Sequence, residues 1–172
     1  MFGFLFGKKK EPAGEAGSSE LLVIERMVPL AQPAAFELFI DRLGSWWPRE
    51  YSWAKDHLQE IGIEPRVDGH CYERRSDGTK SEWGTVLTFA RPEHIVFAWQ
   101  INFDRSFEPS VTLASRVEIR FTAKGPEETQ ILLVHRDFPR HGSGWQKYRS
   151  NLASKSGWPL ILDRYAGAAG ER

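Results

Sequence analysis

The sequence predicts an α+β fold in which a curved antiparallel sheet of about seven strands wraps around a C-terminal helix. Short segments that alternate apolar and polar residues fill the middle of the chain, and turn residues separate them. Apolar residues recur at helical spacing before and after these segments. A sheet and a helix that each carry one apolar face are expected to pack together, and the twist of the sheet would curl it around the helix.

Composition limits the classes of protein. The chain has 172 residues, enough for one domain with a proper core. Lys plus Arg number 23 and Asp plus Glu also number 23, so the formal net charge is zero, which argues against a nucleic-acid partner. The single cysteine, Cys71, leaves no internal disulfide and suits a reducing compartment. No apolar run approaches the roughly 20 residues of a membrane-spanning helix, so we expect a cytoplasmic protein.

The N-terminal segment differs from the rest of the chain. In MFGFLFGKKK the lysines follow a short apolar stretch, whereas a secretory signal has its charges first. We expect residues 1–20 to form a disordered tail and residues 21–168 to form the folded domain. The alternative is weak membrane-surface contact through residues 1–10, in which the aromatic rings enter the interface and Lys8, Lys9 and Lys10 meet anionic head groups.

The folded part is expected to begin with a strand and a helix. The run LLVIERMV is apolar and β-branched, which is typical of a strand. The helix follows, with Pro33 in its first turn and Gly44 at its end. Its buried face has the spacing i, i+3, i+4, i+7: Phe36, Phe39, Ile40 and Leu43.

Six further strands are expected in the middle of the chain. In RVEIRFT the apolar residues Val117, Ile119 and Phe121 alternate with polar ones, so one face of the sheet should be buried and the other wet. The first strand is expected to pair at an edge of this sheet. The six segments are HLQEIGIEP, GHCYERR, SEWGTVLTFA, HIVFAWQI, RVEIRFTA and TQILLVHRDF.

The C-terminal segment is predicted to be helical, with an interruption. Trp145, Tyr148 and Leu152 share one helical face. Gly157 and Pro159 then indicate a fresh helix start rather than a kink. After that start, four residues repeat the helical spacing: Trp158, Ile161, Leu162 and Tyr165.

Eight motifs in a fixed order carry a resemblance to a known family: SWWP, IEPRVDGHCYER, DGT, EWGTV, FAWQI, VEIRFT, HRDF and GWPLILDRYA. The chain resembles the START-like (SRPBCC) superfamily, whose helix-grip fold curls an antiparallel sheet around a long C-terminal helix. It is most similar to the branch related to the C-terminal domain of the activator of the Hsp90 ATPase. One local departure is that Asp68 and Cys71 stand where the family tends to have a glycine and an aromatic residue.

The resemblance implies a cavity between sheet and helix, walled by wide apolar side chains. The alternative is that these side chains simply fill the core. We expect the Tyr165 hydroxyl to be one of the few polar groups in the cavity, with His135 or Arg26 as its partner. The candidate ligand-binding residues are Phe97, Trp99, Val117, Ile119, Phe121, Leu133, Trp158, Ile161, Leu162 and Tyr165.

Candidates for chemistry are few. His135 and Asp137 lie two residues apart on the last predicted strand, and a histidine near a carboxylate can act as a general base. The alternative is a hydrogen-bonded or surface histidine. Glu73, followed by Arg74 and Arg75, is expected at a solvated strand end. The five histidines lack metal-ligand spacing, and phosphate-binding and nucleophile motifs are absent, so we expect neither metal nor cofactor.

Three functions fit these observations. The favoured one is a module that binds a hydrophobic small molecule. The second is a cyclase-type or dehydratase-type enzyme that uses acid or base residues of the cavity. The third, suggested by the resemblance alone, is a domain that interacts with an Hsp90-type chaperone.

Overall fold

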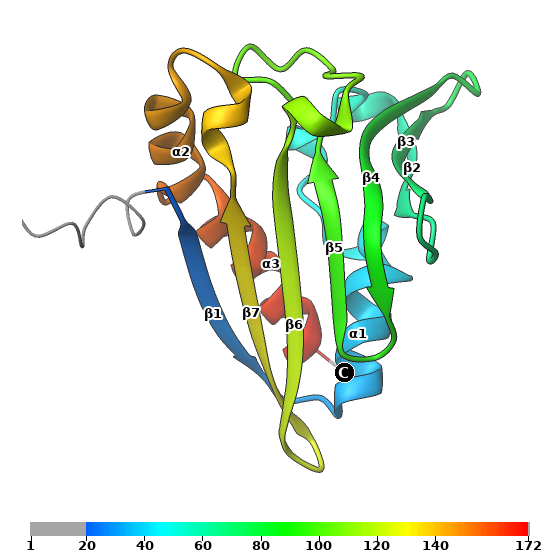
Figure 1. Ribbon diagram of the computed structural model, residues 1–172. Coiled ribbons are helices and arrows are strands. Elements are labelled where there is room, and N and C mark those ends of the chain that lie inside the picture. Colours follow the sequence, from blue (N-terminus) through cyan, green and yellow to red (C-terminus); the bar gives the residue numbers. More distant parts are fainter. Residues whose placement is uncertain (1–19, 172) are drawn as a thin grey trace, which may run out of the picture.

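The computed structural model describes residues 20–171, so residues 1–19, with the expected tail and membrane-surface contact, lie outside the described residues. One sheet has the strand order β1-β7-β6-β5-β4-β3-β2, with every pair antiparallel. The predicted order of strand, helix, six strands and C-terminal helix is confirmed (Figure 1). The strands are β1 Leu22–Val28, β2 Leu58–Ile63, β3 His70–Arg75, β4 Lys80–Ala90, β5 His94–Trp99, β6 Ser115–Gly125 and β7 Glu128–Arg136, and the helices are α1 Gln32–Ile40, α2 Trp145–Ala153 and α3 Trp158–Gly170.

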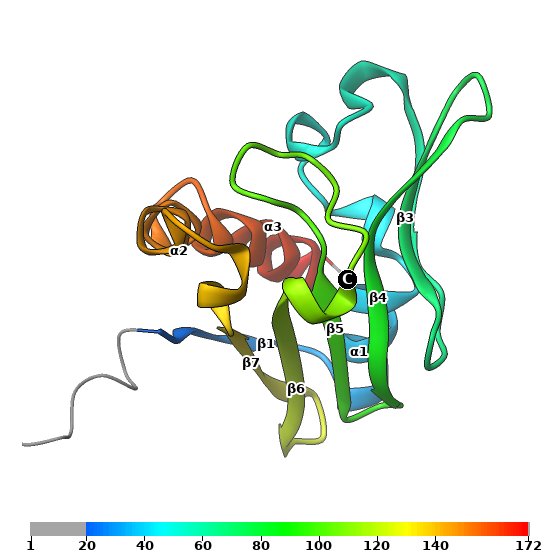
Figure 2. The same cartoon turned by 45° about the horizontal axis from the view of Figure 1, so that its top comes forward.

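The sheet curves around α3. Figures 1 and 2 show α1 and α3 on one side of the sheet and α2 at the end where β7 finishes. Register shifts interrupt the pairing of β2 with β3, of β3 with β4 and of β4 with β5, and a further one lies beside the β6–β7 turn. Irregularities of this kind bend a strand and increase its twist. The first three lie among β2, β3, β4 and β5, in the half of the sheet that rises in Figure 2.

The concave face of the sheet is apolar, as the alternation predicts. Val117, Ile119 and Phe121 of β6 are all buried against the helices. All four residues of the run ILLV in β7 are apolar, so the sequence does not show which of them face the helices. The structure does. Ile131, Leu133 and His135 have no exposed surface, whereas Leu132 and Val134 are half-buried on the other face.

The C-terminal helical segment restarts, as predicted. Helix α2 ends at Ala153 and α3 begins at Trp158, with Pro159 in its first turn. A Cβ atom at Gly157 would lie only 2.1 Å from the carbonyl oxygen of Leu152. Only glycine lets the two helices meet this closely, so the break is a fixed corner.

Aromatic side chains fill the space between α1, α3 and the sheet. The ring of Phe39 lies 4.9 Å from that of Trp46, 4.9 Å from that of Tyr165 and 5.7 Å from that of Phe121. The Tyr165 hydroxyl donates to the carbonyl oxygen of Ala35 at 2.8 Å. The expected partners, His135 and Arg26, are therefore wrong, because α1 brings a backbone acceptor closer than either side chain.

Phe39→Ala is expected to lower the free energy of unfolding by about 3–5 kcal/mol, because it removes a buried ring that three others contact. Urea unfolding measures the loss. Phe107→Ala is the matched control, since Phe107 is 41% exposed and its removal should change stability by about 0.5 kcal/mol or less. Equal losses in the two variants would contradict this assignment of the core.

Candidate ligand-binding site

A pocket of about 350 Å³ opens where β5 ends, beside the corner between α2 and α3. Its walls come from the loop after α1, the end of β5 and the chain that follows it, α2, and the start of α3. Four polar residues contribute to the lining: Asn102, Arg105, Asn151 and Ser156. Aromatic and aliphatic side chains form most of the rest: Trp47, Tyr51, Trp99, Ile101, Phe103, Tyr148, Leu152 and Ile161.

The inner wall is held by a buried tyrosine. The Trp99 indole N–H donates to the Tyr148 hydroxyl at 2.7 Å, and that hydroxyl donates to the carbonyl oxygen of Ile101 at 2.6 Å. Burial raises the pKa of Tyr148 well above its ordinary value, so the hydroxyl keeps its proton and can make both bonds. The pair fixes α2 to the end of β5.

The rim is tied together by bonds to backbone carbonyls. The Trp53 indole N–H donates to the carbonyl oxygen of Arg105 at 3.0 Å, and the Arg105 guanidinium donates to that of Tyr51 at 2.8 Å. The Tyr51 hydroxyl donates to the carbonyl oxygen of Ser156 at 2.6 Å. These bonds join the loop after α1, the chain after β5 and the corner before α3, so three separate segments form one rim.

A chain of hydrogen bonds runs from the core toward the pocket. The Trp158 indole N–H donates to Nδ1 of His135 at 3.0 Å, so Nε2 of His135 carries the ring proton and donates to Ser115 Oγ at 2.7 Å. Ser115 Oγ in turn donates to Nε2 of His141 at 2.7 Å. Nδ1 of His141 then donates to Asn102 Oδ1, which lies 3.2 Å away on the pocket lining.

This chain defines the role of His135. Burial lowers the pKa of the His135 imidazole well below its ordinary value, and both ring nitrogens are engaged. No lone pair is left to accept a proton from a substrate. His135 is therefore a neutral link between α3 and β6 in this arrangement.

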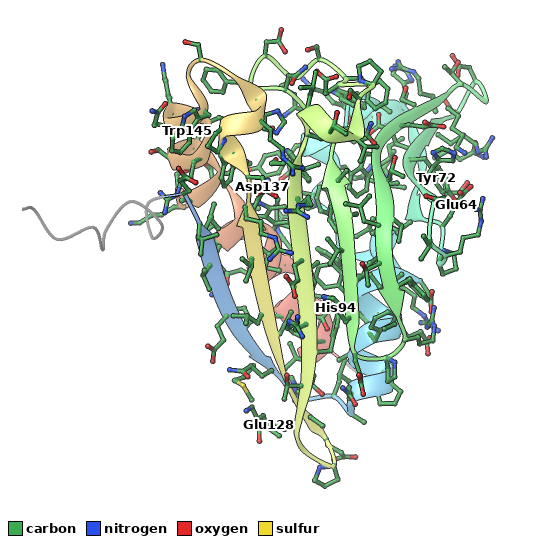
Figure 3. The ribbon with its side chains drawn as sticks, in the orientation of Figure 1. Glu64, Tyr72, His94, Glu128, Asp137 and Trp145 are labelled. Carbon is green, nitrogen blue, oxygen red and sulfur yellow. The ribbon has the colours of Figure 1, made fainter. Side chains whose placement is uncertain are left out.

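The structure does not bring His135 and Asp137 together. Strand β7 ends at Arg136, and Asp137 has a left-handed backbone with φ of 66°. Its carboxylate accepts a hydrogen bond from Nε of Arg116 instead. Figure 3 shows Asp137 at the end of β7. The hydrogen-bonded partners of His135 in this chain include Ser115, which links it to His141, and no sequence motif marks either residue.

All ten candidate ligand-binding residues are buried. Trp99 and Ile161 line the pocket, where they can touch a ligand, and that contact stays a prediction. The other eight belong to the hydrophobic core, where they pack against neighbouring side chains. Tyr148 and Leu152, which the sequence placed on one helical face, line the pocket beside them.

Glu73 is not at a solvated strand end. Only 3% of its surface is exposed, because the segment after α1 folds back over β3. Its carboxylate accepts the backbone N–H of Ala54 at 2.8 Å and that of Trp53 at 3.1 Å. Burial raises the pKa of Glu73, and the two N–H bonds partly oppose that rise.

Residues 20–171 contain no group of three or more His, Cys, Asp and Glu side chains arranged to hold a metal ion. In the same part of the chain, no helix combines the length and apolar character needed to cross a membrane.

A curved antiparallel sheet that grips a C-terminal helix defines the START-like class of proteins, and comparisons with known proteins agree. The family model described as activator of Hsp90 ATPase homolog 1-like protein matches residues 35–169. The chain belongs to this family. A search of curated proteins finds no match.

Solved structures give the same class. The anthrahydroquino-γ-pyrone synthase Txn09 is 29% identical, with a TM-score of 0.61, over 86% of this chain and 95% of the other. CalC from Micromonospora echinospora, described as a self-sacrificing resistance protein, is 22% identical, with a TM-score of 0.60, over 89% and 96%. A protein from Nitrosomonas europaea is 13% identical, with a TM-score of 0.63, over 88% and 95%. The last two show similarity of fold alone.

Stability is expected to fall as the pH drops below about 6.5. Unfolded His135 takes up a proton near its ordinary pKa of about 6.5, whereas the folded protein keeps the ring neutral because its pKa is lowered. The free energy of unfolding should then decrease by up to about 1.4 kcal/mol per pH unit for this histidine. Denaturant unfolding between pH 7 and pH 5.5 measures the slope.

The control separates His135 from other groups that titrate. His135→Gln should reduce the slope, whatever its effect on stability at pH 7, and His141, whose pKa is also lowered by burial, contributes to the slope that remains. His57→Gln, at an exposed position, should leave the slope near that of the unchanged protein. An unchanged slope in His135→Gln would show that the buried ring does not cause the dependence.

Proposed function

We propose that the protein binds a hydrophobic aromatic small molecule in the pocket beside the α2–α3 corner. The observation that carries the proposal is the lining of this 350 Å³ space, where aromatic and aliphatic walls surround a few polar groups. Small-molecule sites have this composition and occupy roughly 300–1,000 Å³. Trp47, Trp99 and Tyr148 contribute aromatic side chains to this lining, which favours an aromatic ligand.

The comparison with Txn09 supports the same ligand class. That protein is 29% identical over 86% of this chain, and its printed name makes it the synthase of an anthrahydroquinone joined to a γ-pyrone. A fused aromatic system is planar and largely apolar, which suits the walls described above. Asn102 and Arg105, on the pocket lining, could orient the polar substituents of such a molecule.

An acid–base enzyme is the second candidate, and Glu73 favours it. A buried carboxylate whose pKa is raised can accept a proton from a bound molecule or return one. We prefer Glu73 to His135, whose two ring nitrogens are both engaged, and to Asp137, whose carboxylate is paired with the Arg116 guanidinium. The third hypothesis, interaction with a chaperone, rests on the name of the family alone. Location in the cytoplasm stays a prediction, and so does membrane contact through residues 1–10.

Filling the pocket should weaken binding. Anthraquinones, isoprenoids and fatty acids are screened by thermal shift, and calorimetry gives the Kd of each hit. A ligand that binds the folded state raises the melting temperature by mass action. Leu152→Trp places a large ring in the pocket and is expected to weaken aromatic hits tenfold or more, by roughly 1.4 kcal/mol.

Leu113→Trp is the matched control, because Leu113 is 53% exposed and does not line the pocket. It should leave Kd unchanged. Tyr165→Phe should lower stability by roughly 1 kcal/mol through loss of the bond to Ala35, yet leave Kd unchanged, since Tyr165 lies in the core. Absence of any aromatic hit would overturn the proposal.

A further inference from the structure

A small cavity adjoins the pocket. It measures about 20 Å³, enough for one water-sized group. Trp47, Tyr51, Ile101 and Arg105 line both spaces, so the cavity continues the pocket toward β3 and β4. Five further residues line the cavity and not the pocket, and Glu73 and Trp83 are two of them.

Trp83 presents an unused hydrogen-bond donor. Its side chain on β4 is 4% exposed, and its indole N–H is buried without a partner among residues 20–171. The ring is held rigidly, stacked on Trp47 at 5.9 Å and in edge contact with Trp99 at 6.0 Å. A buried donor left unpaired is costly, so such groups usually have a partner, and the cavity is the space in which one can sit.

Glu73 presents unused acceptors in the same cavity. Each carboxylate oxygen accepts one backbone N–H, from Trp53 or from Ala54. A carboxylate oxygen can accept a second hydrogen bond, so capacity remains on both atoms. The two hydrogen bonds from the backbone of residues 53 and 54 give Glu73 a structural role. That role does not account for the unpaired N–H of Trp83.

We propose that Trp83 and Glu73 form the polar inner end of the binding site and recognise a hydroxyl group of an aromatic ligand. The hydroxyl oxygen accepts the Trp83 indole N–H, and the hydroxyl proton is donated to the Glu73 carboxylate. A hydroxyl is the smallest ligand group that both donates and accepts, and the cavity holds one group of that size. The inference rests on the proposed function and narrows its ligand class to phenols.

Two probes that differ at one atom position test this. 2-Naphthol carries the hydroxyl, and 2-methoxynaphthalene has the same ring system with a methyl group in place of the proton. The protein is expected to bind 2-naphthol at least tenfold more tightly, the usual effect of a hydrogen bond to a charged group. Glu73→Gln and Trp83→Phe should each bring the ratio of the two Kd values close to one, while the Kd for 2-methoxynaphthalene changes by less than about threefold.

Matched controls identify a merely structural effect. Glu128→Gln and Trp145→Phe change the same residue types at positions that line neither space, on the β6–β7 hairpin end and on α2 (Figure 3), and should preserve the ratio. If Glu73 only supports the turn, Glu73→Gln will lower the melting temperature and weaken both probes equally. That result overturns the inference.

A measurement on the unchanged protein tests the same inference without any variant, so it holds even if a substituted protein fails to fold. With ¹⁵N-labelled protein, the indole N–H proton resonance of Trp83 should move downfield on addition of 2-naphthol, as a new hydrogen bond requires, and should show no such downfield shift with 2-methoxynaphthalene. Equal binding of the two probes, or an unmoved Trp83 resonance, overturns the inference while leaving the proposed function intact. If neither probe nor any anthraquinone binds, the proposed function and the inference both fall.

Discussion

The indole of Trp158, in the first turn of α3, connects the parts of the molecule that build the site. Its ring lies 5.2 Å from that of Trp99 on β5 and 6.3 Å from that of Trp47 in the loop after α1. Its N–H bonds to His135 on β7. One side chain therefore sets the distance between helix and sheet, fixes the tautomer of the buried histidine and supports the inner side of the pocket. Its position depends in turn on the close approach at Gly157, which determines where α3 begins.

This packing explains where the open space lies. Phe39, Trp46, Tyr165 and Trp158 fill the interior between α1, α3 and the sheet, so little volume is left along the length of the helix. At the corner between α2 and α3 the helix leaves the sheet, and side chains from three segments surround the gap without filling it. The fold family supplies a concave sheet, and in this chain the bulky residues leave an aromatic-lined pocket at one end of it.

Periodicity in the sequence predicts most of the fold, because burial of one face imposes it locally. The alternation in β6, the spacing in α1 and α3 and the break at Gly157 are all visible in the residues themselves. The site is less predictable, because it depends on contacts between distant segments. The two arginines that follow Glu73 in the sequence predict a solvent-exposed position. In the structure the backbone of residues 53 and 54 covers its carboxylate. Ser115 and His141 are 26 positions apart and meet only through the fold. The partner of Tyr165 is a backbone carbonyl, which side-chain patterns do not reveal.

The contacts among tryptophans have a further consequence. Trp46, Trp47, Trp83, Trp99 and Trp158 form a continuous series with ring centroids 5.2–6.3 Å apart. Centroid separations this short allow excitation energy to pass between neighbouring indoles, so these five of the seven tryptophans are coupled in fluorescence. Excitation of Trp46, which is buried beside α1, can therefore be followed by emission from Trp47 or Trp99 at the pocket. Emission from these tryptophans therefore responds to the surroundings of Trp47 and Trp99, which line the pocket.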